Sequence, residues 1–478
     1  MNDTANRELP PPANRSWWLE EALALPEFAG QVCPPLASDV RADVVILGGG
    51  YTGMWTAYFL KERDPGIDVV LLEQDICGGG PSGRNGGFCN ALWEDVEILV
   101  ETLGEDAALR TCRVGERSIG AIGEWCESNG VDAWFTRGGH LGVATSRAQD
   151  GAWRGEADAA AGLGSDWFVE LSETQVLERC RSPLFRAGVL TPHAATVQPA
   201  RLARGLRRVI LERGVRIFEQ TPVRRFGART GSPVIAETPK GSVRAGRGIL
   251  GVNAWASQWK RFHRTVLPRG TYIVLTEPVP ERLEEIGWTG GEGIYDFRTA
   301  LHYLRTTRDG RIAFGAASSR AGIGTGLGPR LRYDELSVRR LVHSFHRFFP
   351  SLSDVRLVRA WGGPMDVTGL HVPFFGTLPA GTVHYGLGYT GGGVGPCHMG
   401  GQILSGLALG IEDEHTRLPL VGIEPKPFPP DPFLSVGAFV THEAIVRKDE
   451  AEDEERRPNP VVNFLARLPR RMGYNLGP

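Results

Sequence analysis

The sequence predicts an α/β protein with a doubly wound parallel sheet and a second domain built on an antiparallel sheet. Two observations predict the first sheet: apolar, β-branched runs at 44–47 and 67–72, and a glycine-rich turn with a helix-favouring segment between them. The third observation is an Asp-Gly pair at 309–310 between two extended runs, a strong hairpin signal that predicts part of the second sheet.

The first element is a short apolar strand, Val44–Leu47, of the kind that is buried on both faces of a parallel sheet. Gly48, Gly50 and Gly53 follow it in the spacing G-x-G-x-x-G. The first glycine permits a tight turn, the second lets a pyrophosphate approach the backbone, and the third lets helix and strand pack closely. A helix from Thr52 to about Lys61 would then direct its positive end at the phosphates.

A second apolar strand, Ile67–Glu73, ends in an acid about 20 residues past the last glycine. That spacing predicts a Rossmann-like dinucleotide site in which Glu73 binds a ribose hydroxyl. Glu73 could instead be a solvated strand end. Tyr51 and Thr52 lie in the predicted phosphate turn and complete the unit.

Two further glycine clusters point to a family. The segment Ser82-Gly-Arg-Asn-Gly-Gly87 resembles the flavin-contacting loop of the D-amino-acid oxidase (DAO) family of FAD-dependent oxidoreductases. The segment His384–Gly395, before a helix expected from about His398 to Leu409, resembles the one with which that family closes its flavin site. Matches such as Ser16-Trp-Trp-Leu19 and Phe349-Pro-Ser-Leu352 resemble the γ-glutamylputrescine oxidase branch in particular.

The resemblance implies FAD as the cofactor and a set of contacts for it. Val223 would meet the adenine through its backbone, and Asn253 would contact the phosphate region or cap the next turn. The loop 391–395 would present N–H donors to the flavin. The expected cofactor residues are Gly48, Gly50, Tyr51, Thr52, Gly53, Glu73, Ser82, Arg84, Asn85, Gly86, Gly87, Val223, Asn253, Gly388, Gly391, Gly392, Gly393 and Val394.

The resemblance also implies oxidation of the C–N bond of an amine or amino acid to an imine, with oxygen or another electron acceptor. Arg84, Arg305 and Tyr389 are the catalytic candidates. Arg305 could pair with a substrate carboxylate or form a salt bridge in its own domain, and Tyr389, like Trp361, could wall the cavity or belong to the core. Oxidation of a hydroxy acid or alcohol, or a non-catalytic flavoprotein subunit, stays an alternative.

Two departures from the family lead to further expectations. Some relatives attach FAD through a cysteine near the segment matched by Trp361–Met365, which has none, so we expect non-covalent FAD, with Cys397 and Cys89 as remote alternatives. Sarcosine-oxidase-like relatives also carry a lysine over the flavin where this chain has Ala313. We therefore expect slow reoxidation by oxygen. No metal site is expected around His371 or His398.

The predicted domains are discontinuous. The assignment is an N-terminal extension at 1–41, the FAD-binding domain at 42–145, 195–265 and 355–422, the substrate domain at 146–194 and 266–354, and a tail at 423–478. Within the hairpin, Tyr303 and Arg305 should share one face. The charge run of the tail predicts a solvated helix face, with a protein-contact role as the alternative.

Composition excludes several classes of protein. A formal net charge of −2 gives no attraction for nucleic acid. Seven cysteines without a C-x-x-C pair are typical of a reducing cytoplasm. The chain has no run of roughly 18 uncharged apolar residues and no basic-then-apolar start. We therefore expect a cytoplasmic protein that neither spans a membrane nor binds nucleic acid.

Overall fold

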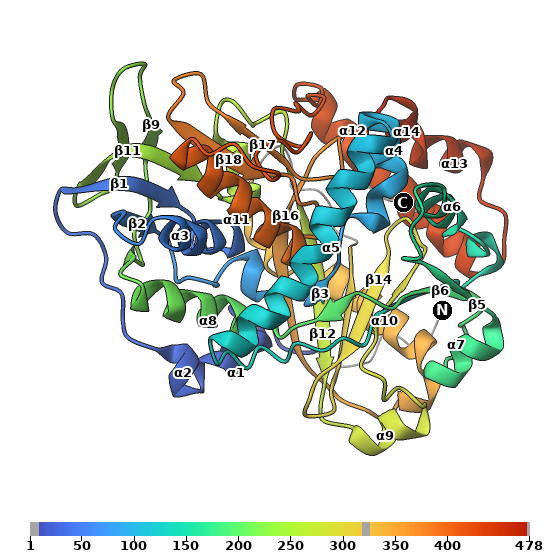
Figure 1. Cartoon of the computed structure of the whole chain (residues 1–478). Coiled ribbons are helices and arrows are strands. Elements are labelled where there is room, and N and C mark those ends of the chain that lie inside the picture. Colours follow the sequence, from blue (N-terminus) through green and yellow to red (C-terminus); the bar gives the residue numbers. More distant parts are fainter. Residues whose placement is uncertain (1–8, 318–325, 476–478) are drawn as a thin grey trace.

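The computed structural model describes residues 9–317 and 326–475, and its core is two eight-stranded sheets (Figure 1). The first sheet has the order β17-β18-β11-β1-β2-β8, with β10 and β9 added beside β11. Its strands are β1 (Val40–Leu47), β2 (Val69–Leu72), β8 (Arg216–Phe218), β9 (Arg225–Gly227), β10 (Val234–Glu237), β11 (Ser242–Leu250), β17 (Phe374–Thr377) and β18 (Val383–Leu387).

The centre of this sheet is parallel, as the apolar runs predict. Leu47 at the end of β1 pairs with Leu250 of β11 and with Leu72 of β2, so the three carboxyl ends meet at one edge. The helices α3 (Tyr51–Arg63) and α11 (Val394–Leu409) pack against this sheet, and α8 (Pro199–Glu212) packs against α3. The turns that follow β1, β2 and β11 are therefore brought together at that edge.

The second sheet has the order β16-β12-β15-β14-β13-β4-β6-β5 and is antiparallel except for the pair β13 and β4. The hairpin predicted around 309–310 is confirmed as β14 and β15. The strands are β4 (His140–Val143), β5 (Val169–Leu171), β6 (Gly188–Thr191), β12 (Leu267–Thr276), β13 (Gly293–Asp296), β14 (His302–Thr306), β15 (Ile312–Ala316) and β16 (Leu357–Val367).

Two strands of the second sheet lie outside the segments assigned to it from the sequence. β4 and β16 fall within 42–145 and 355–422, which were assigned to the FAD-binding domain. β4 pairs with β13 and β6, and β16 pairs with β12. The sequence of a strand does not by itself show which sheet the strand joins. We therefore propose that the substrate domain also includes β4 and β16.

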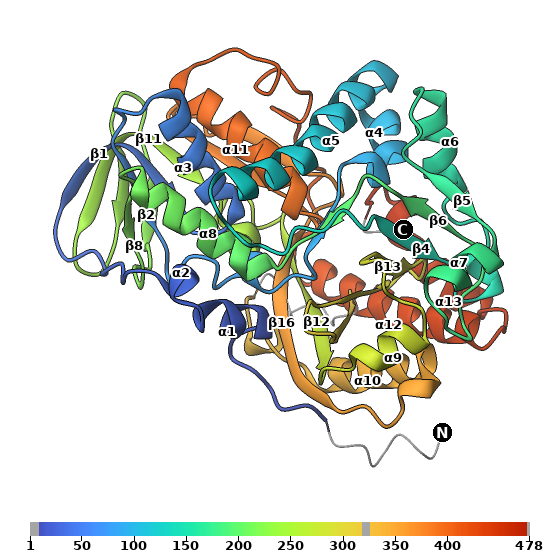
Figure 2. The same ribbon diagram turned by 60° about the horizontal axis from the view of Figure 1, so that its bottom comes forward.

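The remaining elements connect or cover the two sheets (Figure 2). The helices are α1 (Trp17–Leu23), α2 (Pro26–Ala29), α4 (Val96–Leu103), α5 (Glu105–Ser128), α6 (Arg154–Gly162), α7 (Glu173–Arg179), α9 (Pro280–Glu285), α10 (Glu335–Phe348), α12 (Phe433–Asp453), α13 (Pro460–Ala466) and α14 (Leu468–Arg471). A small ladder joins β3 (Phe88–Cys89) to β7 (Ala195–Thr196), and short 3-10 turns include η1 (Pro81–Gly83), η2 (Trp93–Asp95) and η4 (Asn253–Gln258).

The helix expected from His398 begins four residues earlier, at Val394. Gly395 and Pro396 disfavour a helix interior, which is why the sequence placed the start later. Proline is tolerated in a first helical turn, where its missing N–H needs no partner. The glycines 391–393 therefore lead directly into α11.

The tail does more than present a solvated face. Leu434 and Tyr474 are buried and pack with Leu267 of β12, so α12 and the residues after it are part of the fold. Among the helices in the described ranges, none is long and apolar enough to cross a membrane.

Candidate active site

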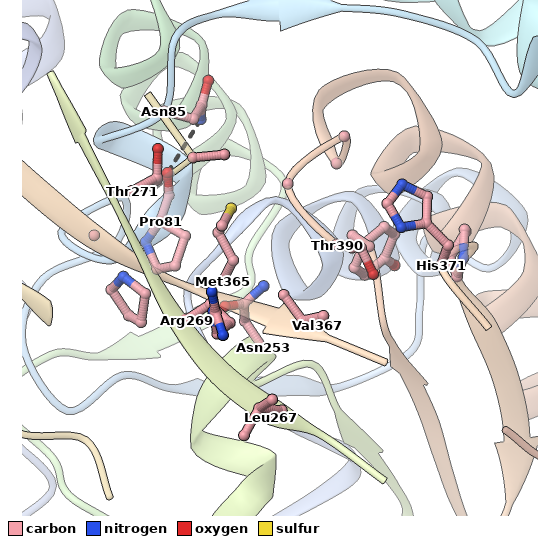
Figure 3. A pocket seen from close by; sticks show the side chains of 18 of the residues that line it. Pro81, Asn85, Asn253, Leu267, Arg269, Thr271, Met365, Val367, His371 and Thr390 are labelled. Atoms are coloured by element: carbon pink, nitrogen blue, oxygen red, sulfur yellow. Dashed lines mark hydrogen bonds between the residues drawn. The ribbon is translucent and has the colours of Figure 1, made fainter. Parts of the chain in front are cut away.

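A cavity of about 1820 Å³ lies where the carboxyl edge of the first sheet meets β12, β14 and β16 (Figure 3). Pockets for one small molecule are typically of the order of 300–1,000 Å³, so this one has room for a dinucleotide and a second ligand. The predicted cofactor residues that line it are Gly48, Gly50, Tyr51, Thr52, Glu73, Ser82, Arg84, Asn85, Gly86, Val223, Asn253, Gly391, Gly392, Gly393 and Val394.

The first glycine turn leaves space where a side chain would intrude. Gly48 has φ of +111°, and a Cβ there would collide with the carbonyl of Gly251. Gly53 packs its backbone against the carbonyl of Gly48 in the same way. Gly50 directly precedes α3, and a Cβ on it would instead approach Ser82 Oγ. This geometry fits a phosphate cradled at a helix N-terminus.

Glu73 follows β2 and lines the same end of the cavity. Its carboxylate accepts hydrogen bonds from the backbone N–H groups of Gly49 and Asp75, each at 2.8 Å. Burial raises the pKa of Glu73 to about 7, against the lowering effect of those two donors. The acid thus fixes the glycine turn and leaves lone pairs for a ribose hydroxyl.

The second glycine loop lies between α3 and β14. Ser82 Oγ accepts a hydrogen bond from the N–H of Tyr51 at 2.8 Å. Asn85 accepts from the N–H of Gly87 and donates to two carbonyls of its own turn, so its amide shapes the loop. A Cβ on Gly86 would press on the Tyr303 ring, which lines the cavity from the second sheet.

Arg84 is buried and lines the cavity. Its guanidinium donates to the carbonyls of Gly79 at 2.9 Å, Gly362 at 3.2 Å and Asn14 at 2.6 Å. Burial, helped by Arg332 and Arg15, lowers its pKa to about 10. The group is therefore still charged at neutral pH, and its hydrogen bonds hold it in place through backbone oxygens alone.

The third glycine cluster is held by an acid that the sequence analysis missed. Asp366 of β16 is fully buried; it accepts from Gly388 N at 2.7 Å and from Asn253 Nδ2 at 2.8 Å. Asn253 and Thr390 both have left-handed backbones, with φ of 48° and 46°. One carboxylate thus fixes two strained turns, and burial raises its pKa to about 6. The sequence signal that could have identified Asp366 is a single acidic residue inside an otherwise apolar part of the strand.

Tyr389 lines the cavity, and its hydroxyl accepts a hydrogen bond from Thr52 Oγ1 at 3.0 Å. Thr52 Oγ1 also lies 3.2 Å from Cys397 Sγ, and burial raises the pKa of that thiol to about 12. The hydroxyl of Tyr389 thus joins the first and third glycine clusters. Gly53, Gly87 and Gly388, which were expected to contact the cofactor, are not among the lining residues; Gly53 and Gly87 allow close backbone packing, and Gly388 packs against the Phe374 and Thr368 side chains.

Arg305 is a correction. Its side chain is buried away from the cavity lining, donates to the Val197 carbonyl and lies over the Trp18 ring at 5.5 Å. It therefore contacts neither a substrate space nor a carboxylate, so both expected roles are wrong. Trp361 is likewise core: it is fully buried, and its Nε1 donates to the Arg84 carbonyl.

The cation that does face the cavity is Arg269 of β12, which the sequence analysis did not consider. It stands opposite Met365 of β16 in the ladder and beside Asn253 in the pocket (Figure 3). Burial lowers its pKa to about 10, so it stays charged at neutral pH. No carboxylate of the described chain pairs with it. Alternate residues of a strand share one face, as was argued for Tyr303 and Arg305. The same argument could have identified Arg269 if β12 had been recognised as a strand of the second sheet.

His371 also lines the cavity, with φ of 71° and its Nε2 3.6 Å from Asp95 Oδ1. Within residues 9–317 and 326–475 no group of three metal-ligating side chains occurs.

Comparisons with known proteins agree with this geometry. The family model "FAD dependent oxidoreductase" (DAO) matches residues 43–407. Probable oxidoreductase OrdL of Haemophilus influenzae is 27% identical over 80% of this chain and 86% of that protein. Gamma-glutamylputrescine oxidoreductase of Escherichia coli is 28% identical over 84% and 92%. The crystal structure of glycine oxidase from Geobacillus kaustophilus has a TM-score of 0.64 at 20% identity, covering 78% of this chain and 96% of that one.

We predict that Glu73→Gln weakens FAD binding by roughly 10- to 100-fold, because it removes charged hydrogen bonds worth about 1.5–3 kcal/mol. Gly50→Val should weaken it further by filling the phosphate space. The measurement is the FAD dissociation constant by flavin fluorescence, with circular dichroism to verify folding. Unchanged constants in both variants would show that this unit does not bind the cofactor.

We also predict that Asp366→Leu destabilises the third glycine cluster, since it leaves two buried donors unpaired at about 1–3 kcal/mol each. Asp366→Asn should be much milder. Its oxygen can accept from Gly388, and its amide can donate to Asn253 Oδ1, which has no partner among the described residues. Thermal midpoints and FAD affinities should follow the order wild type, Asn, Leu; equal losses in both variants would contradict the proposed network.

Proposed function

The chain belongs to the FAD-dependent oxidoreductase (DAO) family, and from that premise we propose that it oxidises the C–N bond of an amine or amino acid. The product is an imine, which water hydrolyses. The named relatives support this choice, because glutamylputrescine and glycine are both amines. When bound, the flavin would supply the group that accepts a hydride from the carbon next to the amine nitrogen.

The cavity-lining glycine turns, Glu73 and Ser82 would hold the dinucleotide, and Asp366 would fix the turn that closes over it. We propose that FAD is bound without a covalent link, since the Trp361–Met365 segment has no cysteine and Cys89 is not among the cavity-lining residues. Acid precipitation should release the yellow colour into the supernatant. Colour retained in the pellet would point to Cys397, which lines the cavity.

The observation that carries the proposal is the half-buried guanidinium of Arg269, which lines the cavity and has no carboxylate partner among the described residues. A cation that is partly removed from water needs an anionic or strongly polar partner, because burial without one is costly. A carboxylate next to the amine of the substrate would meet its fork of donors. Oxidation of a neutral amine by hydride transfer does not require a protein base to remove a hydroxyl proton.

A hydroxy acid or alcohol is the second candidate, favoured by the pair of His371 and Asp95. Removal of a hydroxyl proton needs a base, and an imidazole oriented by a carboxylate suits that task. His371→Gln should abolish oxidation of a hydroxy acid and leave oxidation of the matching amino acid nearly unchanged.

We predict that Arg269→Met raises KM for carboxylate-bearing amines by roughly 10- to 100-fold with a smaller effect on kcat. The lost contact would exist in ground and transition states alike. The measurement is anaerobic bleaching of the flavin by amine pairs with and without a carboxylate. Equal losses for both members of a pair would argue against a carboxylate contact.

We propose that the electron acceptor is a quinone-like or other compound in preference to oxygen. We also propose that the protein is cytoplasmic. Ala313 is buried on β15, where it supplies no charge, and its cross-strand neighbour Arg305 is already bonded to a carbonyl. We predict that stopped-flow reoxidation of substrate-reduced enzyme is slower with air than with a quinone. Rapid reaction with oxygen would show that Arg84 or Arg269 supplies the charge instead.

A further inference from the structure

The outer part of the cavity is walled by residues beyond the family-matched region, which ends at residue 407. Helix α12 turns one face toward it, and the lining positions recur every three or four residues, as a helical period requires. These positions are Phe433, Leu434, Gly437, Ala438, Thr441, His442, Ile445 and Lys448. Residues 466–472, with Tyr474 and Asn475, line the same space.

This wall is fixed to the second sheet at two places. The buried carboxylate of Asp449 accepts a hydrogen bond at 3.0 Å from Ala300 N, which lies in the loop between β13 and β14. Near the other end, the Tyr474 ring stacks on Phe428 at 5.2 Å, and both pack with Leu267 of β12. The segment therefore holds a set position at the cavity and is not a free tail.

The wall presents apolar side chains together with four cations, Lys448, Arg467, Arg470 and Arg471. Arg470 lies 4.0 Å from Glu97, Lys448 lies 2.8 Å from Glu452, and the Arg471 guanidinium lies over the Phe464 ring at 5.0 Å. The side chains left to contact a ligand include Leu434, Ala438, Ile445, Leu468 and Met472.

Trp153 and Phe168 add aromatic surface to the same cavity. An apolar group that contacts the apolar side chains of this cavity would be removed from water, which favours binding by an amount that grows with each methylene buried.

We propose that α12 and residues 466–475 select amines that carry an extended apolar substituent, which lies along this wall. The inference rests on the proposed function and names the substrate class for that same cavity. It follows from the size of the cavity, which exceeds the space of one small ligand, and from the apolar side chains that the wall presents between its charged residues.

Gly437 provides a clean way to alter the wall. It lies on the cavity face of α12, and a Cβ there meets no atom within 4 Å. Gly437→Leu therefore adds a side chain on the cavity face of α12 at a position with room for its Cβ, in a helix that favours leucine over glycine. Gly162 at the end of α6 also has open space for a Cβ but is not among the lining residues. Gly162→Leu is the matched control.

The experiment uses holoenzyme and two homologous series, n-alkylamines and N-alkylglycines with alkyl chains of two to eight carbons. Initial rates of flavin bleaching give kcat and KM for each compound. In the wild type, kcat/KM should rise by about fourfold per methylene. Gly437→Leu should lose at least tenfold for the eight-carbon compounds, mainly through KM, and less than twofold for the two-carbon ones. Gly162→Leu should match the wild type.

A flat series in the wild type, or an equal loss for short and long chains in Gly437→Leu, would overturn the inference. If no amine or amino acid bleaches the wild-type flavin, the proposed function fails as well, which is a different result from a flat series. Absorbance-detected binding of the same compounds to the oxidised holoenzyme adds a readout that does not depend on turnover. The chain-length preference should appear there too and be lost in Gly437→Leu.

Discussion

The close backbone contact among Gly48, Gly53 and Gly251 is the constraint on which the rest of the molecule depends. The turn after β1 touches the turn after β11 on one side and the start of α3 on the other, and a Cβ at Gly48 or Gly53 would collide with a carbonyl. Because these turns approach so closely, β1, β11 and α3 converge at one edge of the sheet. The space left at that edge is the inner end of the cavity, where the positive end of α3 faces the opening.

Buried hydrogen bonds then join the two sheets around that space. Asp366 lies on β16 of the second sheet, yet it fixes Asn253 and Gly388, which follow strands of the first. Arg84 connects the N-terminal segment, the second glycine loop and β16 through three carbonyls. Such contacts have little net value individually, but leaving any of these buried groups unpaired is expensive. The shape of the cavity therefore depends on the buried hydrogen bonds of Asp366 and Arg84.

The cavity combines two parts with different origins in the chain. Its inner part uses glycine turns and fixed charges that belong to the family-matched region, where the chemistry of the cofactor requires a defined geometry. Its outer part uses α12 and the residues after it, which hold apolar side chains against the second sheet. Arg269 of β12 lines the same cavity, two residues from Leu267, which packs with Leu434 of α12. We infer that reaction type and substrate choice are separable in this protein.

The sequence predicted well those features that depend on local spacing. The glycine turn, the two flanking strands, Glu73 and the hairpin around 309–310 arise from neighbours within about 30 residues, so their patterns are legible in the chain. The start of α11 was predicted four residues late because Gly395 and Pro396 are poor in a helix interior yet acceptable in its first turn.

By itself, the sequence determined the dinucleotide unit, the family and the order of the glycine clusters, since each follows from residue type at fixed spacing. Only the tertiary structure decided which arginine of the second sheet lines the cavity. Arg305 and Arg269 both lie on strands of the second sheet, but the Val197 carbonyl binds the first, and the second faces open space. It also decided the role of Asp366, whose partners lie 22 and 113 residues away, and the position of α12. Pairings of this range depend on strand register and packing across the whole chain, which no local pattern encodes.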